Sequence, residues 1–178
     1  LGDFSSTGNF DFNATIQGEY NPGLSPEIRA QLGLNDGRIK SPRLANDLKQ
    51  VSFVASYSNG KYRNRSSSSI DISNLQGYFN RELTELKLRV DNFEEPVIDF
   101  HFDGIVPLNA VYGLFNSPSI TGGSGEIEVQ NLRLKGKYED MIRVSRADRI
   151  ESSGVLEFDD AALSINGEKL ILDRGTLT

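Results

Sequence analysis

The chain has 178 residues, a length that suits one domain able to bury a sizeable core. Hydrophobic residues make up 37% of it and charged residues 25%, which excludes the composition of a disordered protein. A net charge of −6 with scattered basic residues argues against nucleic-acid binding. Because the chain has no cysteine, disulfides, thiolate metal sites and a cysteine nucleophile are excluded.

Alternation of apolar and polar residues dominates the chain and predicts strands with one apolar face. The alternating runs, in chain order, are residues 10–16, 51–57, 86–90, 98–102, 126–130, 156–159 and 170–172. Turn-forming dipeptides and tripeptides separate them at residues 21–23, 35–37, 58–60, 122–123 and 166–167. Asn-Gly and Asp-Gly pairs are typical of hairpins, so we expect neighbouring strands to be antiparallel.

Helix signals are few. Pro107 suits a first helical turn, and apolar residues follow it at helical spacing at positions 108, 111, 114 and 115. Residues 43–48 and 139–144 are each expected to form a turn or two of helix. The prediction is a mainly β protein with a few short helices.

Three segments resemble one another: residues 8–18, 125–136 and 154–167. Each begins and ends with glycine and contains an apolar–polar–apolar run followed by Asn or Asp. In the second segment the apolar positions change parity between Val129 and Leu132, which predicts a bulge or bend near Asn131. Such repetition favours a series of similar strands over an enzyme fold built around one cleft.

So little helix cannot cover the apolar face of a broad sheet. We therefore expect a curved antiparallel sheet that either folds onto itself as a closed sandwich or curls into a groove or roll filled by something else. An apolar surface left open is costly unless it binds a ligand.

The only histidine, His101, lies between Asp99 and Asp103 at strand spacing, so the three side chains share one side. Histidine with two carboxylates is a set that binds divalent metals. The bulky apolar residues at positions 98, 100 and 102 lie on the opposite side, however, and are expected to face the core. We therefore interpret the acidic side as the solvated face. A Ser-His-Asp triad is not supported either, since no Gly-x-Ser-x-Gly elbow is present.

Three other patterns are better interpreted as structure than as chemistry. Residues 122–125 (GGSG) lack the Gly-Lys-Ser/Thr of a phosphate-binding loop and are expected to lead into a strand. Glu94 and Glu95 precede Pro96 and predict a turn rather than a catalytic carboxylate pair. The basic run at residues 61–65 predicts a solvated loop. We therefore expect no catalytic residue, metal or other cofactor.

The order of several motifs is similar to that of AsmA-like proteins of Bacteroidetes-type bacteria. The motifs are residues 34–44 (LNDGRIKSPRL), 51–55 (VSFVA), 70–77 (IDISNLQG), 92–104 (NFEEPVIDFHFDG), 106–111 (VPLNAV) and 154–167 (GVLEFDDAALSING). Together they cover most of the chain from residue 8 onward. Ser41 stands where that family has a tyrosine before the proline.

The resemblance implies a periplasmic, β-rich segment of a larger envelope protein of the AsmA and TamB type. Such proteins are anchored in the inner membrane and are associated with outer-membrane biogenesis and with lipid movement along an apolar groove. The sequence begins and ends within strand patterns, so we expect residues 1–178 to be one domain excised from such a protein, with its membrane anchor elsewhere.

The expected function is to hold lipid acyl chains, or a partner protein of the envelope, along the apolar sheet face without chemistry. The residues expected on that face or in the core are Phe10, Phe12, Phe53, Leu86, Leu88, Ile98, Phe100, Phe102, Ile127, Val129, Leu156 and Phe158. The alternative is a closed sandwich that binds protein or glycan, with Tyr20, Tyr62 and Tyr78 as candidate contacts. A hydrolase or metalloenzyme that depends on His101 is the function the sequence favours least.

Overall fold

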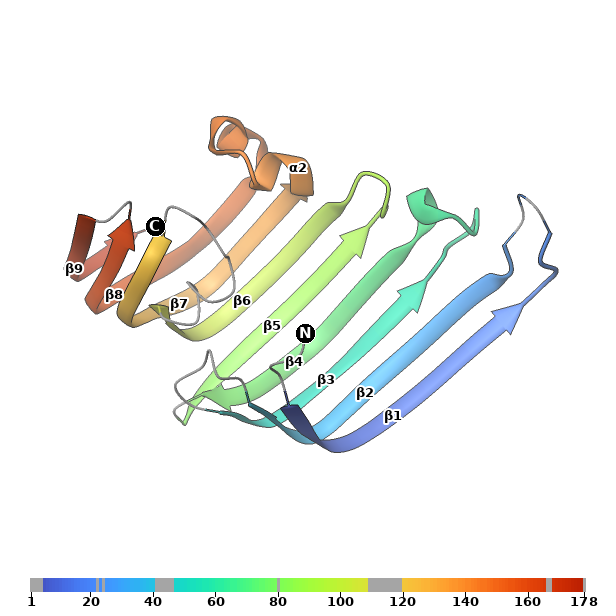
Figure 1. Ribbon diagram of the computed structural model, residues 1–178, viewed down its shortest axis with the longest axis horizontal. Coiled ribbons are helices and arrows are strands. Elements are labelled where there is room, and N and C mark those ends of the chain that lie inside the picture. The colour runs from blue at the N-terminus through green and yellow to red at the C-terminus, as the bar shows by residue number, and fades with distance from the viewer. Residues whose placement is uncertain are drawn as a thin grey trace.

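A single antiparallel sheet contains the nine strands of the described residues, in sequence order (Figure 1). The computed structural model describes residues 5–21, 23, 25–40, 47–79, 81–108, 120–165 and 168–177. The strands are β1 (Ser5–Gln17), β2 (Glu27–Lys40), β3 (Leu48–Ser58), β4 (Ser69–Phe79), β5 (Glu82–Asp91), β6 (Val97–Pro107), β7 (Ile120–Lys137), β8 (Glu151–Ile165) and β9 (Glu168–Leu177). The predicted mainly β, antiparallel fold is confirmed.

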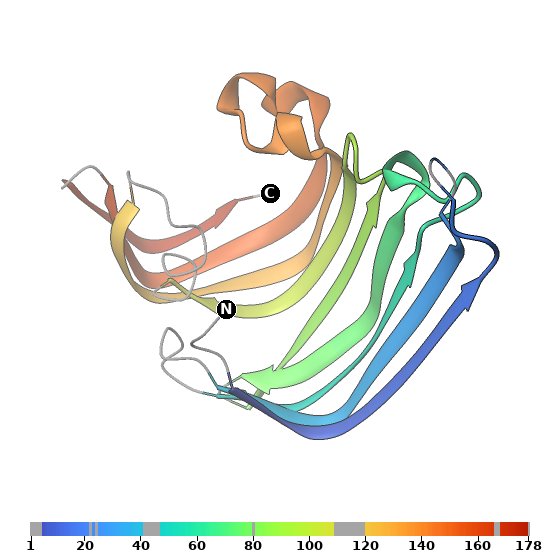
Figure 2. The ribbon, with the colours of Figure 1, turned by 45° about the vertical axis from the view of Figure 1, so that its right-hand side comes forward.

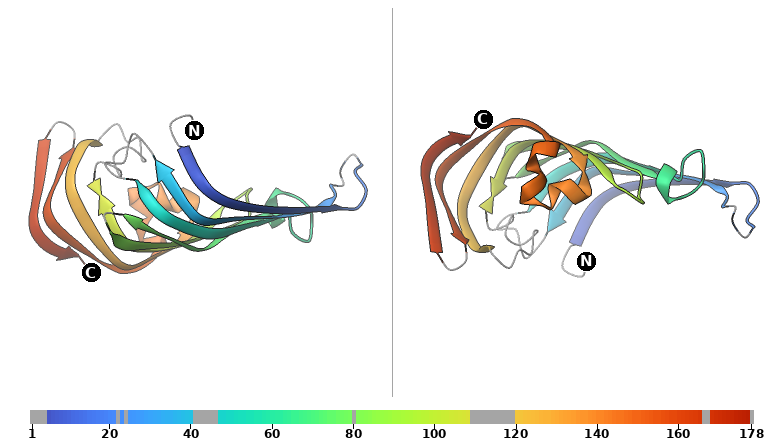
Figure 3. Two further views of the ribbon diagram at one scale, coloured as in Figure 1. Left: turned by 90° about the horizontal axis from the view of Figure 1, so that it is seen from below. Right: turned by 90° about the horizontal axis from the view of Figure 1, so that it is seen from above.

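The sheet twists and bends into an open, curved layer (Figures 2 and 3). Strands β1 and β9 lie at its two edges and do not pair with each other in the described part of the chain. Of the two forms left open by the sequence, the described residues adopt the curved open sheet rather than the closed sandwich.

Helical structure is limited to short pieces. Helix α2 (Tyr138–Met141) and the 3-10 segment η2 (Val144–Arg149) follow β7, and η1 (Arg65–Ser67) lies between β3 and β4. The turn of helix predicted at residues 139–144 is confirmed by α2. Pro107 ends β6, and Leu108, which follows it, is helical. The rest of the helix expected there falls on residues 109–119, outside the described residues, as do residues 43–46. None of the described helices has the length and apolar character needed to cross a membrane.

Bulges interrupt the strand pairing at several places. At Asn131, φ is 51° and the β7–β8 register shifts between Gln130 and Arg133, so the predicted bulge is confirmed. Asp36 (φ 49°) and Asn74 (φ 51°) lie at comparable shifts in β2 and β4. A bulge adds one residue to a strand, which bends the strand and resets which side its following residues face.

The prediction of turns at residues 35–37 and 122–123 is wrong, because both segments lie inside strands β2 and β7. Asp36 and Gly37 form a bulge opposite Val51. The error has a physical reason: a hairpin turn and a bulge both need a residue with positive φ, and Asp, Asn and Gly supply it in either setting. The turn predicted at residues 58–60 is confirmed, since β3 ends at Ser58.

The glycine that begins each repeated segment has a conformational role. Gly8 and Gly154 have φ of 146° and 142°, and each lies at a register shift beside a bulge. Gly125, with φ of 84°, lies at a further shift in β7. All three glycines thus have a positive φ at a register shift, a conformation that residues with a Cβ rarely adopt.

Replacing Gly154 tests this geometry. A Cβ at Gly154 would lie 2.7 Å from the Cα of Leu132, in a backbone conformation that disfavours any side chain. Gly154→Ala should lower the free energy of unfolding by about 1–3 kcal/mol, measured by urea denaturation. The control is Gly33→Ala, where the nearest atom is 3.7 Å away, and it should change that free energy by less than about 1 kcal/mol. Equal effects of the two variants would contradict the bulge assignment.

Candidate functional site: the concave apolar face

Apolar side chains form a continuous row across seven strands. The strand register aligns Phe12, Leu32, Ala55, Ile72, Leu88, Phe100 and Leu134, from β1 to β7. A parallel row contains Ala14, Ala30, Tyr57, Ile70, Val90 and Ile98. Since directly opposed residues on neighbouring strands share a face, each row lies on one side of the sheet.

The bulges keep the apolar residues on this side in β6, β7 and β8. Phe102 is opposite Leu132 before the Asn131 bulge, whereas Val106 is opposite Ile127 after it. Ile127 is in turn opposite Phe158, and Val129 is opposite Leu156. Without the extra residue at Asn131, Ile127 and Val129 would face the side opposite to Leu132.

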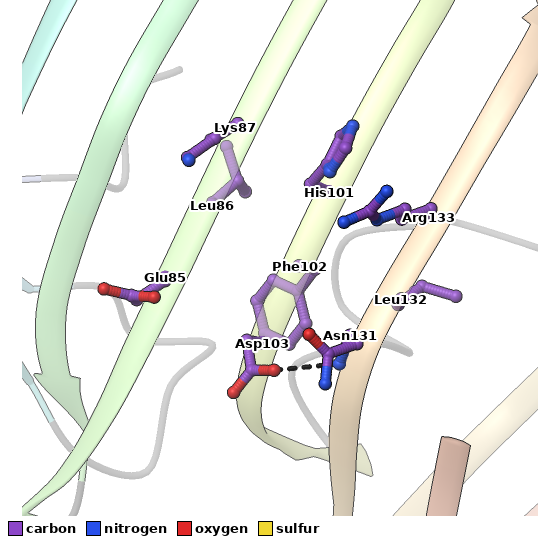
Figure 4. A pocket seen from close by; sticks show the side chains of 9 residues that line it. All are labelled: Glu85, Leu86, Lys87, His101, Phe102, Asp103, Asn131, Leu132 and Arg133. Carbon is purple, nitrogen blue, oxygen red and sulfur yellow. Dashed lines mark hydrogen bonds between the residues drawn. The ribbon is translucent and has the colours of Figure 1, made fainter. Parts of the chain in front are cut away.

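The apolar side is the concave one. Figure 1 looks into the curve of the sheet, and Figure 4 looks at the opposite side, because β4 to β7 follow in reverse order there. In Figure 4 the charged side chains point toward the viewer, while Leu86, Phe102 and Leu132 lie behind the strands. We call the inner surface the concave apolar face, and define it by the two rows above together with Phe10, Leu34, Phe53, Leu86, Phe102, Leu132, Val106, Ile127, Phe158, Val129 and Leu156.

Exposure along the concave apolar face is graded. On the edge strand β1, Phe10, Phe12 and Ile16 are 52%, 72% and 67% exposed. Val129, paired on both sides, is only 5% exposed. The other predicted residues of this face are half-buried: Phe53, Leu86, Leu88, Ile98, Phe100, Phe102, Ile127, Leu156 and Phe158. All twelve predicted residues thus belong to one partly exposed surface rather than to a closed core.

Two phenylalanines define the middle of this surface. The rings of Phe100 and Phe102 have centroids 6.3 Å apart and planes only 5° from parallel. Residues two apart on a strand stand side by side on one face, and these two rings are stacked parallel to each other on the apolar side. A contiguous exposed surface of this kind is rare on soluble monomers and usually marks a binding site.

Sequence reasoning missed Leu34, one of the most buried side chains, although it placed Val51 at the start of an alternating run. Leu34 and Val51 are almost completely buried at the bulge in β2, where Gly37 and Gly77 bring the backbone close to them. Leu34 lies next to the segment interpreted as a turn, which hid its place inside a strand. The signal that could have found it is the Asp36-Gly37 pair, interpreted as a bulge.

The opposite, convex side carries the charged residues, including the predicted solvated triad. His101 Nε2 lies 2.9 Å from Asp99 Oδ1, and Lys135 Nζ lies 3.6 Å from Asp99 Oδ2. His101 aligns with Lys87 and Arg133 on the adjacent strands, so its row carries two permanent cations. The residues that line a shallow hollow on this side include Lys87, His101 and Arg133 (Figure 4). In the part of the chain that the structure describes, no three His, Cys, Asp or Glu side chains cluster in a way that could hold a metal.

Asp103 has a structural role that its place on the solvated side did not reveal. Its Oδ2 accepts a hydrogen bond of 2.8 Å from the backbone N–H of Asn131 (Figure 4). The bulge removes Asn131 from the regular β-ladder, and Asp103 supplies an acceptor from the neighbouring strand. Ser52 Oγ plays the same part for the backbone N–H of Asp36, at 3.4 Å. Polar side chains of the convex side therefore support the bulges that shape the concave side.

Substitution of Asp103 separates its charge from its role as an acceptor. Asp103→Ala should lower the free energy of unfolding by about 0.5–1.5 kcal/mol, because the exposed N–H of Asn131 exchanges its carboxylate acceptor for water. Asp103→Asn keeps an acceptor oxygen and should recover at least half of that loss in the same urea titration. An alanine variant as stable as the wild type would show that the hydrogen bond does not support the bulge.

No protein family model, curated protein or solved structure matches this chain.

Proposed function

We propose that this protein is a non-enzymatic, AsmA-like segment of a bacterial envelope protein, and that it holds lipid acyl chains along the concave apolar face. The observation that carries the proposal is the row of apolar residues that crosses seven strands without a charged residue. Hydrocarbon chains bind to such a surface through burial of apolar area, which needs no directional contacts.

The dimensions of the row suit an acyl chain. Adjacent strands are about 4.8 Å apart, so a row across seven strands is roughly 30 Å long. The hydrocarbon core of a bilayer is about 30 Å thick and contains two leaflets, so an acyl chain that spans one leaflet, about 15 Å, fits within the length of the row. The side chains on both sides of the row are also apolar, so a chain lying along it would meet hydrocarbon over its length.

The distribution of charge supports the same proposal. Ion pairs such as Arg89 with Asp91, at 2.8 Å, and Lys135 with Asp99 occupy the convex side. The hydrogen bond and charge of the Asp91 carboxylate raise the pKa of Arg89, whose guanidinium is permanently charged and 55% exposed. A ligand without charge therefore has a reason to prefer the concave side.

The wider setting is part of the proposal. The motif order of AsmA-like proteins implies the periplasm, an inner-membrane anchor elsewhere in a longer protein, and a part in outer-membrane biogenesis. An open curved sheet with an apolar inner face is the architecture that such a role requires. The rival role as a closed interaction module receives no support from the described residues, which form one sheet and no second layer.

Photo-crosslinking at two neighbouring residues tests lipid binding. A benzophenone amino acid at position 100 should form adducts with phospholipid when the protein is expressed in the bacterial envelope, because Phe100 lies on the concave apolar face. The same amino acid at position 101 should form few or none, because His101 lies on the convex side of the same strand. Mass spectrometry of the purified protein measures the adducts.

The matched pair controls for expression, strand and depth in the sheet. Adducts in equal yield at both positions would indicate nonspecific contact with membranes. If no phospholipid is found at position 100, and native mass spectrometry of the unmodified protein detects none, the proposal is wrong.

A further inference from the structure

Three side chains of the convex side form a row that has two permanent cations and no carboxylate. Lys87, His101 and Arg133 are directly opposed on the interior strands β5, β6 and β7. Figure 4 shows them together at the shallow hollow of this side. Neither Lys87 nor Arg133 forms an ion pair or a side-chain hydrogen bond with another residue of the described part of the chain. We call these three residues the His101 row.

The next row along the same strands shows how the sheet balances such charges internally. There Asp99 stands between Arg89 and Lys135, and its Oδ2 lies 3.6 Å from Lys135 Nζ. Opposite charges at directly opposed positions stabilise a sheet, so this arrangement of cation, carboxylate and cation needs no other partner. In the His101 row the central position carries an imidazole, which has no permanent charge. The comparison locates the missing negative charge above His101.

The carboxylates that line the hollow do not supply this charge. Asp103 Oδ2 accepts a hydrogen bond from the backbone N–H of Asn131. Glu85 is opposite Asp103, in a row about 7 Å away along the strands, and no ion pair joins it to the His101 row among the described residues. The hollow thus has an anionic end and a cationic end, and the cations are left for a ligand.

We propose that the hollow binds a phosphate monoester, with its phosphoryl group above His101 and between the side chains of Lys87 and Arg133. Adjacent strands are about 4.8 Å apart, so an anion above the central strand lies near both cations. A phosphate monoester carries a charge of about −1.5 to −2 at neutral pH, which matches two cations, whereas a carboxylate carries only one negative charge.

The donors of the row suit phosphate oxygens. The planar guanidinium of Arg133 can bind two of them at once, and the ammonium of Lys87 acts as a point charge on the other side. Ser153 on β8 is opposite Arg133 and extends the row with a hydroxyl donor. The site lies on the side of the sheet opposite to the concave apolar face, so it does not rest on lipid binding.

Two substitutions of the central residue test where the phosphate lies. His101→Asp supplies the internal carboxylate that the neighbouring row has, so it should weaken binding of methyl phosphate at least about tenfold. His101→Asn leaves the centre of the row without charge and should keep the affinity within about threefold. Amide NMR shifts, followed during a titration with methyl phosphate at constant ionic strength, measure the affinity. A wild-type chain that does not saturate, or an aspartate variant that binds as tightly as the asparagine variant, would overturn the proposal.

Neutralising single charges tests the two cations. Lys87→Gln and Arg133→Gln should each weaken binding of methyl phosphate at least about fivefold in the same titration. The matched control is Lys137→Gln, because Lys137 is exposed on the strand of Arg133 and is already paired with Glu95 at 3.0 Å. It should change the affinity less than about twofold. Equal losses in all three variants would indicate a general attraction of anions and would contradict a site.

The class of ligand has its own test. Dimethyl phosphate, a diester with a single charge, should bind at least about fivefold more weakly than methyl phosphate, and equal affinities would contradict a monoester site. Vesicles of phosphatidic acid carry the same monoester on a lipid. Sedimentation of the chain with these vesicles that His101→Asp removes would assign the phosphate to a lipid, and binding of the free ester without sedimentation would assign it to a soluble molecule. Because the NMR titrations contain no acyl chain, their outcome is separate from that of the crosslinking at position 100.

Discussion

The two-residue period of a β-strand is the constraint on which this structure depends. A strand of 18 residues such as β7 must keep its apolar side chains on one side while the sheet curves beneath it. Strict alternation over that length would give a straighter strand, and any single insertion would turn the rest of its apolar residues outward. The bulges at Asp36, Asn74 and Asn131 supply both the bend and the correction of parity. Curvature and the separation of apolar from charged surface thus have one origin.

A one-layer sheet has little core, so its stability has to come from elsewhere. The backbone ladder between neighbouring strands is the main source, helped by a small cluster around Leu34 and Val51. Side-chain hydrogen bonds also connect the ends of neighbouring strands. Buried Asn59 accepts from the N–H of Ile28 at 2.9 Å and donates to the carbonyl of Pro26 at 2.8 Å, which joins the start of β2 to the end of β3. These contacts lie where the strands end, outside the concave apolar face.

The sequence predicted the strands and the apolar face well because both follow from alternation, which is local. The Asn131 bulge was also predictable, since a change of parity between Val129 and Leu132 within one strand requires an extra residue. The Asp36 bulge was mistaken for a turn because the same residue types supply positive φ in both. The hydrogen bond from Asn131 to Asp103 could not be predicted, since it depends on which residues of two strands the register brings together. Whether the sheet closes was equally beyond local patterns, as closure is a property of all the strands at once.

The strictly sequential order of the strands has a consequence for how the chain folds. Each strand pairs with its neighbours in sequence, so every new pairing closes only a short loop. Long β structures usually fold slowly because distant segments must meet, but here the sheet can grow one strand at a time, in the order of synthesis. Its cooperativity is then that of a linear array, in which each strand is stabilised only by the two beside it. A defect in a central strand such as β5 would therefore divide the sheet into two shorter ones, each still able to fold, rather than unfold the whole.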